Sequence, residues 1–376
     1  MRDRGTLHTA APPLPVYSTH IPRSGGTSHL AHEPMVLVFV ALTKDHPIGG
    51  AVSRYYRANT LARRGHAVHV VHVYARAVPE ANRACPPRWF RFDRSIQHHL
   101  RLDSLPTNLQ ADVALGVARR GIVPPSVGLP FNFLQGRWWE SRGGGWAART
   151  EGPIACISNW LVEACTAQGI APHRLRHIPN GLDHATFRIL EPPYERRPRV
   201  AFLHHPLPAK GARDSVAVLD AARVEVPDLQ AVAFGVPSRP RDLPDWIEYV
   251  ERPDHHQLAA GVYNTSRAFL CSSRIEGFGN TSLEAMACGC ALVTLDTGGS
   301  RDYAHHGDTA LVAEQGDLDT LAANLVAVLQ DRDLHRRLVT RSLREAQTFT
   351  WDRSTDLLEA LLREYVADSD RFLVNS

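Results

Sequence analysis

Two glutamates eight residues apart, Glu276 and Glu284, flank a glycine-containing turn late in the chain. The apolar run at residues 267–273 predicts a strand, the run at 276–280 ends it, and Leu283 with its neighbours predicts a short helix. Free backbone N–H groups and the helix dipole converge at such a helix N-terminus and favour a bound anion. A carboxylate on each side of the turn can bind sugar hydroxyls beside a phosphate. The pattern indicates a nucleotide-sugar site.

The second glutamate also has a purely structural interpretation. Thr281 to Glu284 match a capping box, in which the Glu284 side chain accepts a hydrogen bond from the N-cap N–H. Glycine turns between strands and helices are common in α/β proteins. The first glutamate, Glu276, has no place in such a cap, and this favours the binding site.

The segment resembles the E-x7-E signature of family 4 glycosyltransferases, and the match includes the runs EGFG and LEAM. Members of that family are retaining enzymes with the GT-B fold, an α/β fold of two Rossmann-like domains that face each other across a cleft. The likeness covers nearly all of residues 35–367. The segment PIGGAVSRYYRANTLARRGHAVHVV resembles the N-terminal start of family members, and HIPNGLDHATF resembles the segment in which their chain crosses from one domain to the other. A weaker likeness, in LPFNFLQGRWWES and FLHHPLPAKG, is to a branch that includes rhamnosyltransferases of bacterial surface glycans.

The resemblance implies roles for the residues around the turn. Glu276 would bind hexose hydroxyls and stabilise positive charge near the anomeric carbon, and Glu284 would hold the ribose hydroxyls. Backbone N–H groups of the turn would contact the sugar and the diphosphate. The other donor-binding residues in this segment are Phe278, Gly279, Asn280, Thr281 and Leu283.

Lys210 is expected to supply positive charge to the leaving diphosphate. Without a metal, that charge must be met by cations and N–H donors arranged in advance, and Lys210 lies between a predicted strand and a predicted helix. The family carries an arginine five residues earlier, where this chain has His205. A protonated histidine would do the same work, with a pKa raised by the diphosphate. The alternative is that His205 is only a strand-end residue.

Gly49 and Gly50 are expected to form an opposing loop whose backbone approaches the phosphates, although a plain strand-to-helix turn uses glycine equally well. The expected mechanism is front-face substitution, in which the donor's own phosphate oxygen takes the acceptor proton. Neither a metal nor a cofactor is expected. The histidine that many relatives carry after a D-V-x-H-type strand is missing after Asp112, so no acceptor-side base is assigned.

Two acidic pairs match the D-x-D pattern of metal-dependent transferases, Asp317 with Asp319 and Asp331 with Asp333. Both stand at predicted helix starts, where acidic residues favour the helix dipole, so helix capping is the expected role. Four adjacent histidine pairs occur, but neighbours on a strand point to opposite faces and share no ligand set. No metal site is predicted.

A chain of 376 residues is expected to hold about two domains. We expect a disordered leader at 1–34, an N-terminal acceptor domain at 35–182 with a returning helix at 349–370, a linker at 183–197, and a nucleotide-sugar domain at 198–348. Strands alternate with helices in both domains, which is typical of parallel sheets covered on both faces.

The composition is that of an ordinary globular protein, with 44% hydrophobic and 22% charged residues. A net charge of +3 does not indicate nucleic acid, and no apolar run reaches the ~18 residues of a membrane span. Six cysteines without C-x2-C spacing favour reduced thiols and a cytoplasmic location. The segment Pro87–Phe92, rich in arginine and aromatic residues, predicts a core-and-rim element, with contact to a glycan, nucleobase or membrane surface as the alternative.

Lysine is rare in this chain. Of 42 basic residues only Lys44 and Lys210 are lysines, a bias that suggests a GC-rich genome. Both follow predicted strands, which chance placement would also explain.

Two other functions share the predicted fold. Sugar-nucleotide epimerases need no acceptor but need acid–base side chains near the sugar, and no such set is recognised. A sugar-nucleotide-binding protein without catalysis is the second. The expected partner is a dTDP-, UDP- or GDP-hexose donor. A natural product or a surface glycan is the acceptor hypothesis, and neither the acceptor nor the oligomeric state follows from these motifs.

Overall fold

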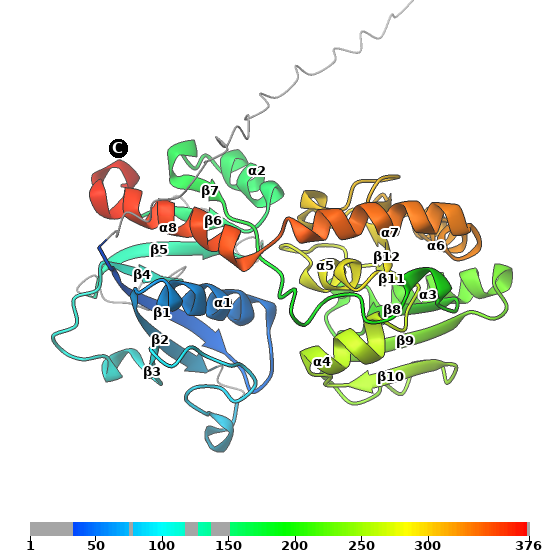
Figure 1. Ribbon diagram of the computed structural model, residues 1–376, viewed down its shortest axis with the longest axis horizontal. Helices are drawn as coiled ribbons and strands as arrows, with labels where there is room; N and C mark the ends of the chain where they lie inside the picture. Colours follow the sequence, from blue (N-terminus) through cyan, green and yellow to red (C-terminus); the bar gives the residue numbers. More distant parts are fainter. Residues whose placement is uncertain (1–32, 75–77, 117–126, 137–150, 374–376) are drawn as a thin grey trace, which may run out of the picture. The chain divides into compact units, whose positions relative to one another are not determined.

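The computed structural model describes residues 33–74, 78–116, 127–136 and 151–373. The predicted leader therefore lies outside the described residues except for its last two positions. Residues 34–376 form one compact unit. Its described part contains two parallel sheets, each covered by helices, which are shown in Figure 1.

The first sheet has seven strands in the order β3-β2-β1-β4-β5-β6-β7. They are β1 Val36–Thr43, β2 Ala67–Tyr74, β3 Gln97–His99, β4 Val113–Leu115, β5 Leu129–Leu134, β6 Ile154–Cys156 and β7 Leu175–His177. β1 and β2 pair from Val36 with Ala67 to Thr43 with Tyr74. Most of their side chains are buried on both faces of the sheet, which explains their near-continuous apolar sequences.

Three helices cover this sheet: α1 Gly49–Arg63, α2 Asn159–Ala167 and α8 Trp351–Ala367. α8 is the last of the described α-helices in the sequence, yet it packs beside α1, the first, as Figure 1 shows for the red and blue helices. Leu358, Leu361 and Leu362 of α8 are buried in the same cluster as Leu37 and Phe39 of β1. A helix that returns to the N-terminal sheet is thus found where the sequence predicts it.

The second sheet has six strands in the order β10-β9-β8-β11-β12-β13. They are β8 Arg199–Leu203, β9 Gln230–Gly235, β10 Ile247–Glu251, β11 Ala268–Cys271, β12 Ala291–Leu295 and β13 Ala310–Ala313. Its helices are α3 Ala212–Glu225, α4 His255–Gln257, α5 Asn280–Ala287, α6 Leu318–Gln330 and α7 Arg332–Gln347. Because all strand pairs are parallel, the strands of each sheet end at one common edge.

The helix that follows β10 changes type along its length. The short α4 continues as a π-helix over Leu258–Tyr263. Asp254 caps α4 in a reciprocal capping box with Gln257. The wider π turn places Tyr263 in the core, where its side chain is fully buried.

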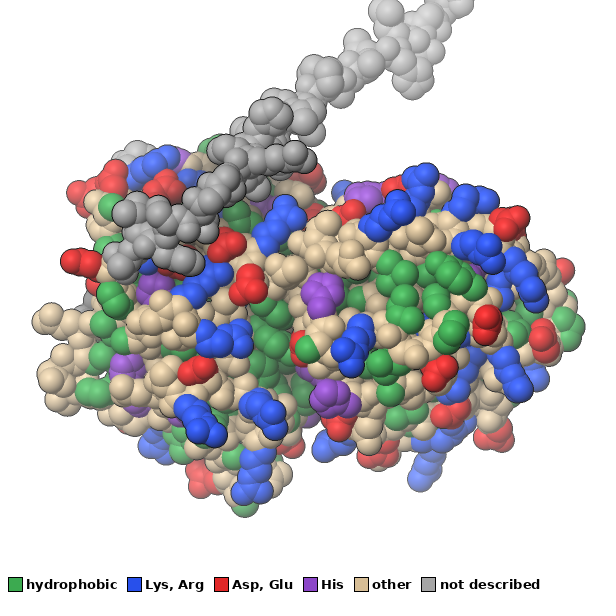
Figure 2. All heavy atoms as spheres, in the orientation of Figure 1, with side chains coloured by type: hydrophobic (Ala, Val, Ile, Leu, Met, Phe, Trp, Pro, Cys, Tyr) green, Lys and Arg blue, Asp and Glu red, His purple; other side chains and the backbone are tan. Residues whose placement is uncertain are grey.

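The segment Pro87–Phe92 packs on α1, as the core-and-rim interpretation predicts. The rings of Trp89, Phe90 and Phe92 surround the buried Tyr55 with centroid distances of 5.6, 5.1 and 4.7 Å. Figure 2 shows basic and acidic side chains interspersed over the visible face of the molecule. None of the helices in the described part of the chain is both long and apolar enough to cross a membrane.

Candidate active site

A cavity of about 710 Å³ lies where strands of both sheets end. Lys44 follows β1, Gln135 follows β5, His205 follows β8 and Val236 follows β9, and all four line it. Nine of the eleven residues predicted from the sequence also line it: Glu276, Lys210, His205, Gly49, Gly50, Phe278, Gly279, Asn280 and Thr281. The other two, Leu283 and Glu284, line a smaller space that shares Asn280. The carboxyl ends of parallel strands are where ligands bind in such folds.

Lys210 and Glu276 form an ion pair inside the cavity. The Nζ atom of Lys210 donates to both carboxylate oxygens at 2.7 Å. Lys210 ends a short 3-10 turn before Gly211, whose φ is +64° and where a Cβ atom would lie 2.1 Å from the backbone oxygen of Ser272. Only glycine fits that approach, so the turn that carries the lysine is held against β11.

His205 lies near Lys210 but is not positioned as a cation in the free protein. Its Nδ1 accepts a hydrogen bond from the Leu207 N–H at 3.1 Å. Burial, followed by the charges of Lys210 and Lys44, lowers the pKa of His205. The neutral ring therefore prevails without a ligand, and the predicted rise in pKa concerns only the complex with a diphosphate.

Gly49 and Gly50 do not form a separate loop, which corrects the prediction. They are the first two residues of α1, after an extended Ile48 at the N-cap. Hydrogen bonds into the helix begin with Ala51, and the N–H groups of Gly49 and Gly50 have no acceptor among the described residues. The start of α1 is thus a set of free N–H donors facing the cavity.

α5 presents a second set of donors. It begins after Gly279, an N-cap residue with φ of +88°. The N–H groups of Asn280 and Thr281 have no acceptor among the described residues. A Cβ atom on Gly49 would lie 3.6 Å from Nδ2 of Asn280, so the first turns of α1 and α5 meet at the cavity. Two helix N-termini favour an anion between them.

The capping-box interpretation of Glu284 is wrong. Gly279 is the N-cap of α5, and no side chain caps that helix. The Glu284 carboxylate instead accepts a hydrogen bond from the Tyr263 hydroxyl at 3.3 Å. Glu284 is therefore not needed to start the helix.

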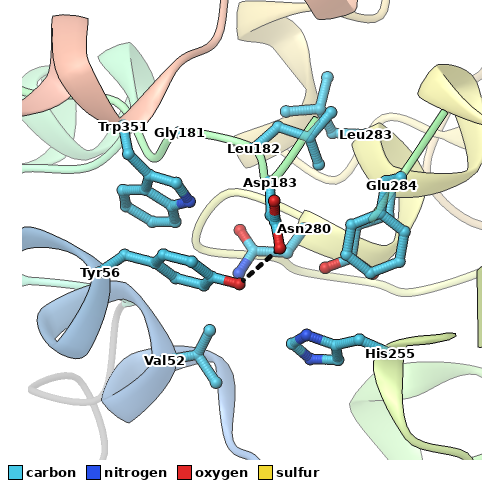
Figure 3. A pocket seen from close by; sticks show the side chains of 11 residues that line it. Val52, Tyr56, Gly181, Leu182, Asp183, His255, Asn280, Leu283, Glu284 and Trp351 are labelled. Atoms are coloured by element: carbon cyan, nitrogen blue, oxygen red, sulfur yellow. Dashed lines mark hydrogen bonds between the residues drawn. The ribbon is translucent and has the colours of Figure 1, made fainter. Parts of the chain in front are cut away.

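Glu284 faces a small cavity of about 20 Å³ between α1, α5 and the interdomain crossing, shown in Figure 3. The Tyr56 hydroxyl donates to Asp183 there at 3.1 Å. Glu284 keeps some accessible surface but lies deep in the protein, and this burial raises its pKa to about 7. The hydrogen bond from Tyr263 acts in the opposite direction, and the charge of Asp183 adds to the rise.

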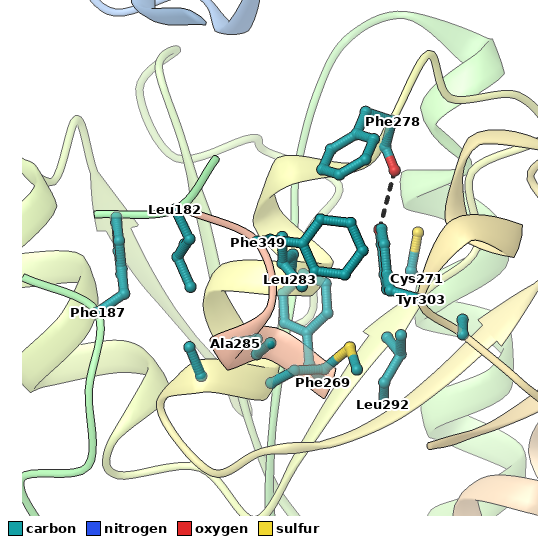
Figure 4. Close-up of a cluster of buried hydrophobic side chains, with 14 of the residues drawn as sticks. Leu182, Phe187, Phe269, Cys271, Phe278, Leu283, Ala285, Leu292, Tyr303 and Phe349 are labelled. Atoms are coloured by element: carbon teal, nitrogen blue, oxygen red, sulfur yellow. Dashed lines mark hydrogen bonds between the residues drawn. The ribbon is translucent and has the colours of Figure 1, made fainter. Parts of the chain in front are cut away.

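The turn before α5 is held by residues that sequence analysis did not assign to the site. The Ser158 hydroxyl donates to the Gly277 carbonyl at 2.7 Å and leaves α2 without a side-chain cap. The Tyr303 hydroxyl donates to the carbonyls of Phe278 at 3.0 Å and Gly279 at 2.7 Å. Figure 4 shows Tyr303 beneath Phe278, within a buried aromatic cluster. Groups from both domains therefore fix this backbone.

The first aspartate of each pair caps a helix, as predicted, and the second lies in the first helical turn. Asp317 accepts from the Thr320 N–H at the start of α6, and Asp331 accepts from the N–H groups of Asp333 and Leu334 at the start of α7. Neither pair is among the residues that line the cavity. Across the described ranges, no group of three or more His, Cys, Asp or Glu side chains is arranged to hold a metal ion.

Comparison with known proteins identifies the C-terminal domain. Residues 186–345 match the family described as Glycosyl transferases group 1. This segment of the chain is a group 1 glycosyl transferase domain. It contains Lys210, Glu276 and Glu284, so the predicted family is confirmed where the E-x7-E resemblance lies.

Relatives of known name support the group 1 assignment. The chain is 33% identical to O-antigen chain mannosyltransferase B of Escherichia coli over 110 residues, which is 29% of this chain and 28% of that protein. It is 28% identical to the phosphatidyl-myo-inositol mannosyltransferase of Mycolicibacterium smegmatis over 204 residues, 51% of each chain. The match thus spans about half the length of these curated relatives or less.

The fold extends over nearly the whole chain. The structure of Anabaena Alr3699/HepE in complex with UDP-glucose superposes with a TM-score of 0.66 and 15% identity, covering 87% of this chain and 99% of that one. The α/β architecture with two parallel sheets and its solved neighbours confirm the predicted GT-B fold around the group 1 domain.

Proposed function

We propose that this protein is a retaining glycosyltransferase that moves a hexose from a nucleoside-diphosphate sugar to an acceptor hydroxyl. The cavity carries the proposal, because Lys210 and two helix N-termini supply the positive charge that a leaving diphosphate needs, with Glu276 beside them. Names of the relatives support it: two are mannosyltransferases, and the solved HepE structure holds UDP-glucose.

In the proposed complex, the diphosphate lies between the first turns of α1 and α5 and takes the ammonium of Lys210. Glu276, released from its ion pair, accepts hydrogen bonds from hexose hydroxyls and stabilises positive charge at the anomeric carbon. Glu284 holds the ribose hydroxyls. His205 becomes protonated beside the diphosphate, whose charge reverses the effect of burial on its pKa.

The proposed chemistry occurs on one face of the sugar. The bond from the anomeric carbon to the phosphate oxygen breaks as the acceptor oxygen bonds to the same face of that carbon. The departing phosphate oxygen takes the acceptor's proton. No side chain acts as a nucleophile, and the anomeric configuration is retained.

Positive groups of the chain replace a metal in this proposal, so no cofactor is required beyond the donor. We expect EDTA to leave the rate unchanged. The proposed location is the cytoplasm. The acceptor class that we favour is a surface glycan or a natural product, since one relative is an O-antigen chain mannosyltransferase.

The test is to incubate the protein with UDP-, dTDP- and GDP-hexoses and a panel of glycan and natural-product acceptors. We expect one donor to release its nucleoside diphosphate, with faster release when an acceptor is present and a product of unchanged anomeric configuration by NMR. An inverted product would overturn the mechanism. An epimerised donor without transfer would favour the epimerase alternative, and binding without turnover would favour the non-catalytic one.

A further inference from the structure

The second lysine of the chain lines the same cavity as the first. Lys44 follows β1 of the N-terminal sheet, whereas Lys210 follows β8 of the C-terminal sheet, and both border the cavity of about 710 Å³. Of 42 basic residues in the chain, these are the only lysines, and all others are arginines. Both lysines of the chain therefore border the same cavity, one from each domain, which suggests a shared role in binding there.

The backbone at Lys44 is fixed while its side chain is free. The Trp89 indole N–H donates to the Lys44 carbonyl at 2.9 Å. The preceding residue, Thr43, is fully buried, and its hydroxyl is hydrogen-bonded to Tyr55 at 2.7 Å. The ammonium group of Lys44 makes no ion pair with any described residue, whereas Lys210 is neutralised by Glu276.

The charges around the cavity do not cancel. Among its described lining residues the lysines are Lys44 and Lys210, and Glu276 is the only carboxylate. Since Glu276 pairs with Lys210, the ammonium of Lys44 remains without a counter-charge. Lys44 also lies close enough to His205 to lower its pKa, so its positive charge reaches the part of the cavity beside Lys210.

We propose that Lys44 is a second binding residue for the donor's diphosphate, contributed by the N-terminal domain. The inference rests on the proposed function. Lys44 and Lys210 contact the diphosphate from opposite domains, so the donor is bound by both sheets at once.

The experiment compares nucleoside diphosphates with nucleosides by isothermal titration calorimetry. Wild type, Lys44→Met and Lys44→Arg are titrated with UDP, dTDP and GDP and with the corresponding nucleosides. A hydrogen bond to a charged group is worth enough to predict about tenfold weaker diphosphate binding in Lys44→Met. Nucleoside binding should be unchanged, and Lys44→Arg should restore most of the diphosphate affinity.

Arg213→Met is the matched control. Arg213 lies in the first turn of α3, its side chain is 94% exposed and it does not line the cavity. Its replacement by methionine therefore changes the net charge by the same amount. Equal diphosphate affinity in Lys44→Met and Arg213→Met would overturn the inference. If Lys210→Met lost diphosphate affinity and Lys44→Met did not, the proposed function would stand and the role of Lys44 would be overturned. Failure of the wild type to bind any of the three nucleoside diphosphates would overturn both.

Discussion

Lys210 and Glu276 neutralise each other in the free cavity. Their side chains keep only 26% and 12% of their surface exposed, so removing one partner leaves a partly desolvated charge behind. Donor binding must exchange this ion pair for contacts with the diphosphate and the sugar. The two residues therefore act as one unit, and their variants are expected to be non-additive.

We expect Lys210→Met and Glu276→Gln each to lower kcat by about 100-fold or more, because each removes charge stabilisation in the transition state. The double variant should be little worse than the poorer single variant. Steady-state kinetics, with thermal unfolding as a control for folding, measures this. Near-normal turnover in both single variants would contradict the site.

Glu284 is predicted to make nucleotide binding depend on pH. Its pKa of about 7 means that the carboxylate, the better acceptor for ribose hydroxyls, forms as the pH rises through neutrality. Affinity for UDP or the preferred nucleotide should increase from about pH 6 to about pH 8 in the wild type. Glu284→Gln should bind more weakly and lose that increase, as measured by calorimetry; equal wild-type affinities at the two pH values would contradict the role.

The same shift has a consequence for stability. A carboxyl whose folded pKa lies above its unfolded value of 4.5 stabilises the folded state below that pH, and this contribution is lost as the pH rises through about 7. Glu284→Gln lacks the titrating group. Between pH 4.5 and about pH 7, the free energy of unfolding of Glu284→Gln should therefore decrease less than that of the wild type.

Most residues of the site were predicted, but their contacts were not. Glu276 was predicted from the turn that it precedes and Lys210 from its place between a predicted strand and helix, yet their ion pair joins positions 66 residues apart, and no local pattern encodes such a contact. Serine favours the N-cap position that Ser158 occupies before α2, whereas tertiary structure directs its hydroxyl to Gly277. The scarcity of lysine marked Lys44 as unusual, but no sequence pattern placed it beside Lys210.

At the scale of elements, prediction succeeded where apolar runs were long. β1, β2 and α8 lie where their sequences indicate. β3, β7 and β10 have no such signal, because Gln97–His99 and Leu175–His177 are three-residue strands with few apolar side chains and Ile247–Glu251 is an edge strand. Such strands are defined by their neighbours more than by their own composition.

β3 is attached to β2 by histidine pairs. His72 bonds to His98 at 3.0 Å and His69 to His99 at 3.1 Å. Burial, followed by neighbouring histidines, lowers the pKa of His72 to about 3, and burial and His99 lower that of His98 to about 4. The folded state therefore keeps these rings neutral at pH values where the unfolded chain, with a pKa near 6.5, is protonated.

Acid is expected to destabilise this edge of the sheet. The stabilisation is complete above pH ~6.5 and decreases as the pH falls towards the folded values, by at most about 1.4 kcal/mol per pH unit for each histidine. His72→Gln keeps the capacity for hydrogen bonds but does not titrate, so its stability should fall less between pH 6.5 and 4.5. Urea unfolding at several pH values measures this; parallel curves for variant and wild type would contradict it.

At the scale of the whole molecule, α8 makes the N-terminal domain depend on the end of the chain. Leu358 is fully buried among residues of β1 and α1. Leu358→Ala should lower the free energy of unfolding by about 2–5 kcal/mol, because it leaves a cavity in that core. Val366→Ala, on the same helix but 40% exposed, is the control and should change it by less than about 1 kcal/mol.

Denaturant unfolding followed by tryptophan fluorescence measures both variants. Loss of stability that is equal in the two would contradict the packing of α8 on the N-terminal core. The family resemblance predicted both this helix and its return to the N-terminal domain, whereas an apolar stripe alone fits many surfaces and does not identify a docking partner.

The chain crosses between the two sheets twice, and the crossings are bonded to each other. The Leu182 N–H donates to the Phe349 carbonyl at 3.0 Å, and Leu182 and Thr350 form a parallel bridge. The two sheets are also joined beyond these crossings, because Ser158 donates to Gly277 and His177 is hydrogen-bonded to Asp302. A pair of fluorophores placed on the two sheets across the cavity would measure whether donor binding changes the distance between them.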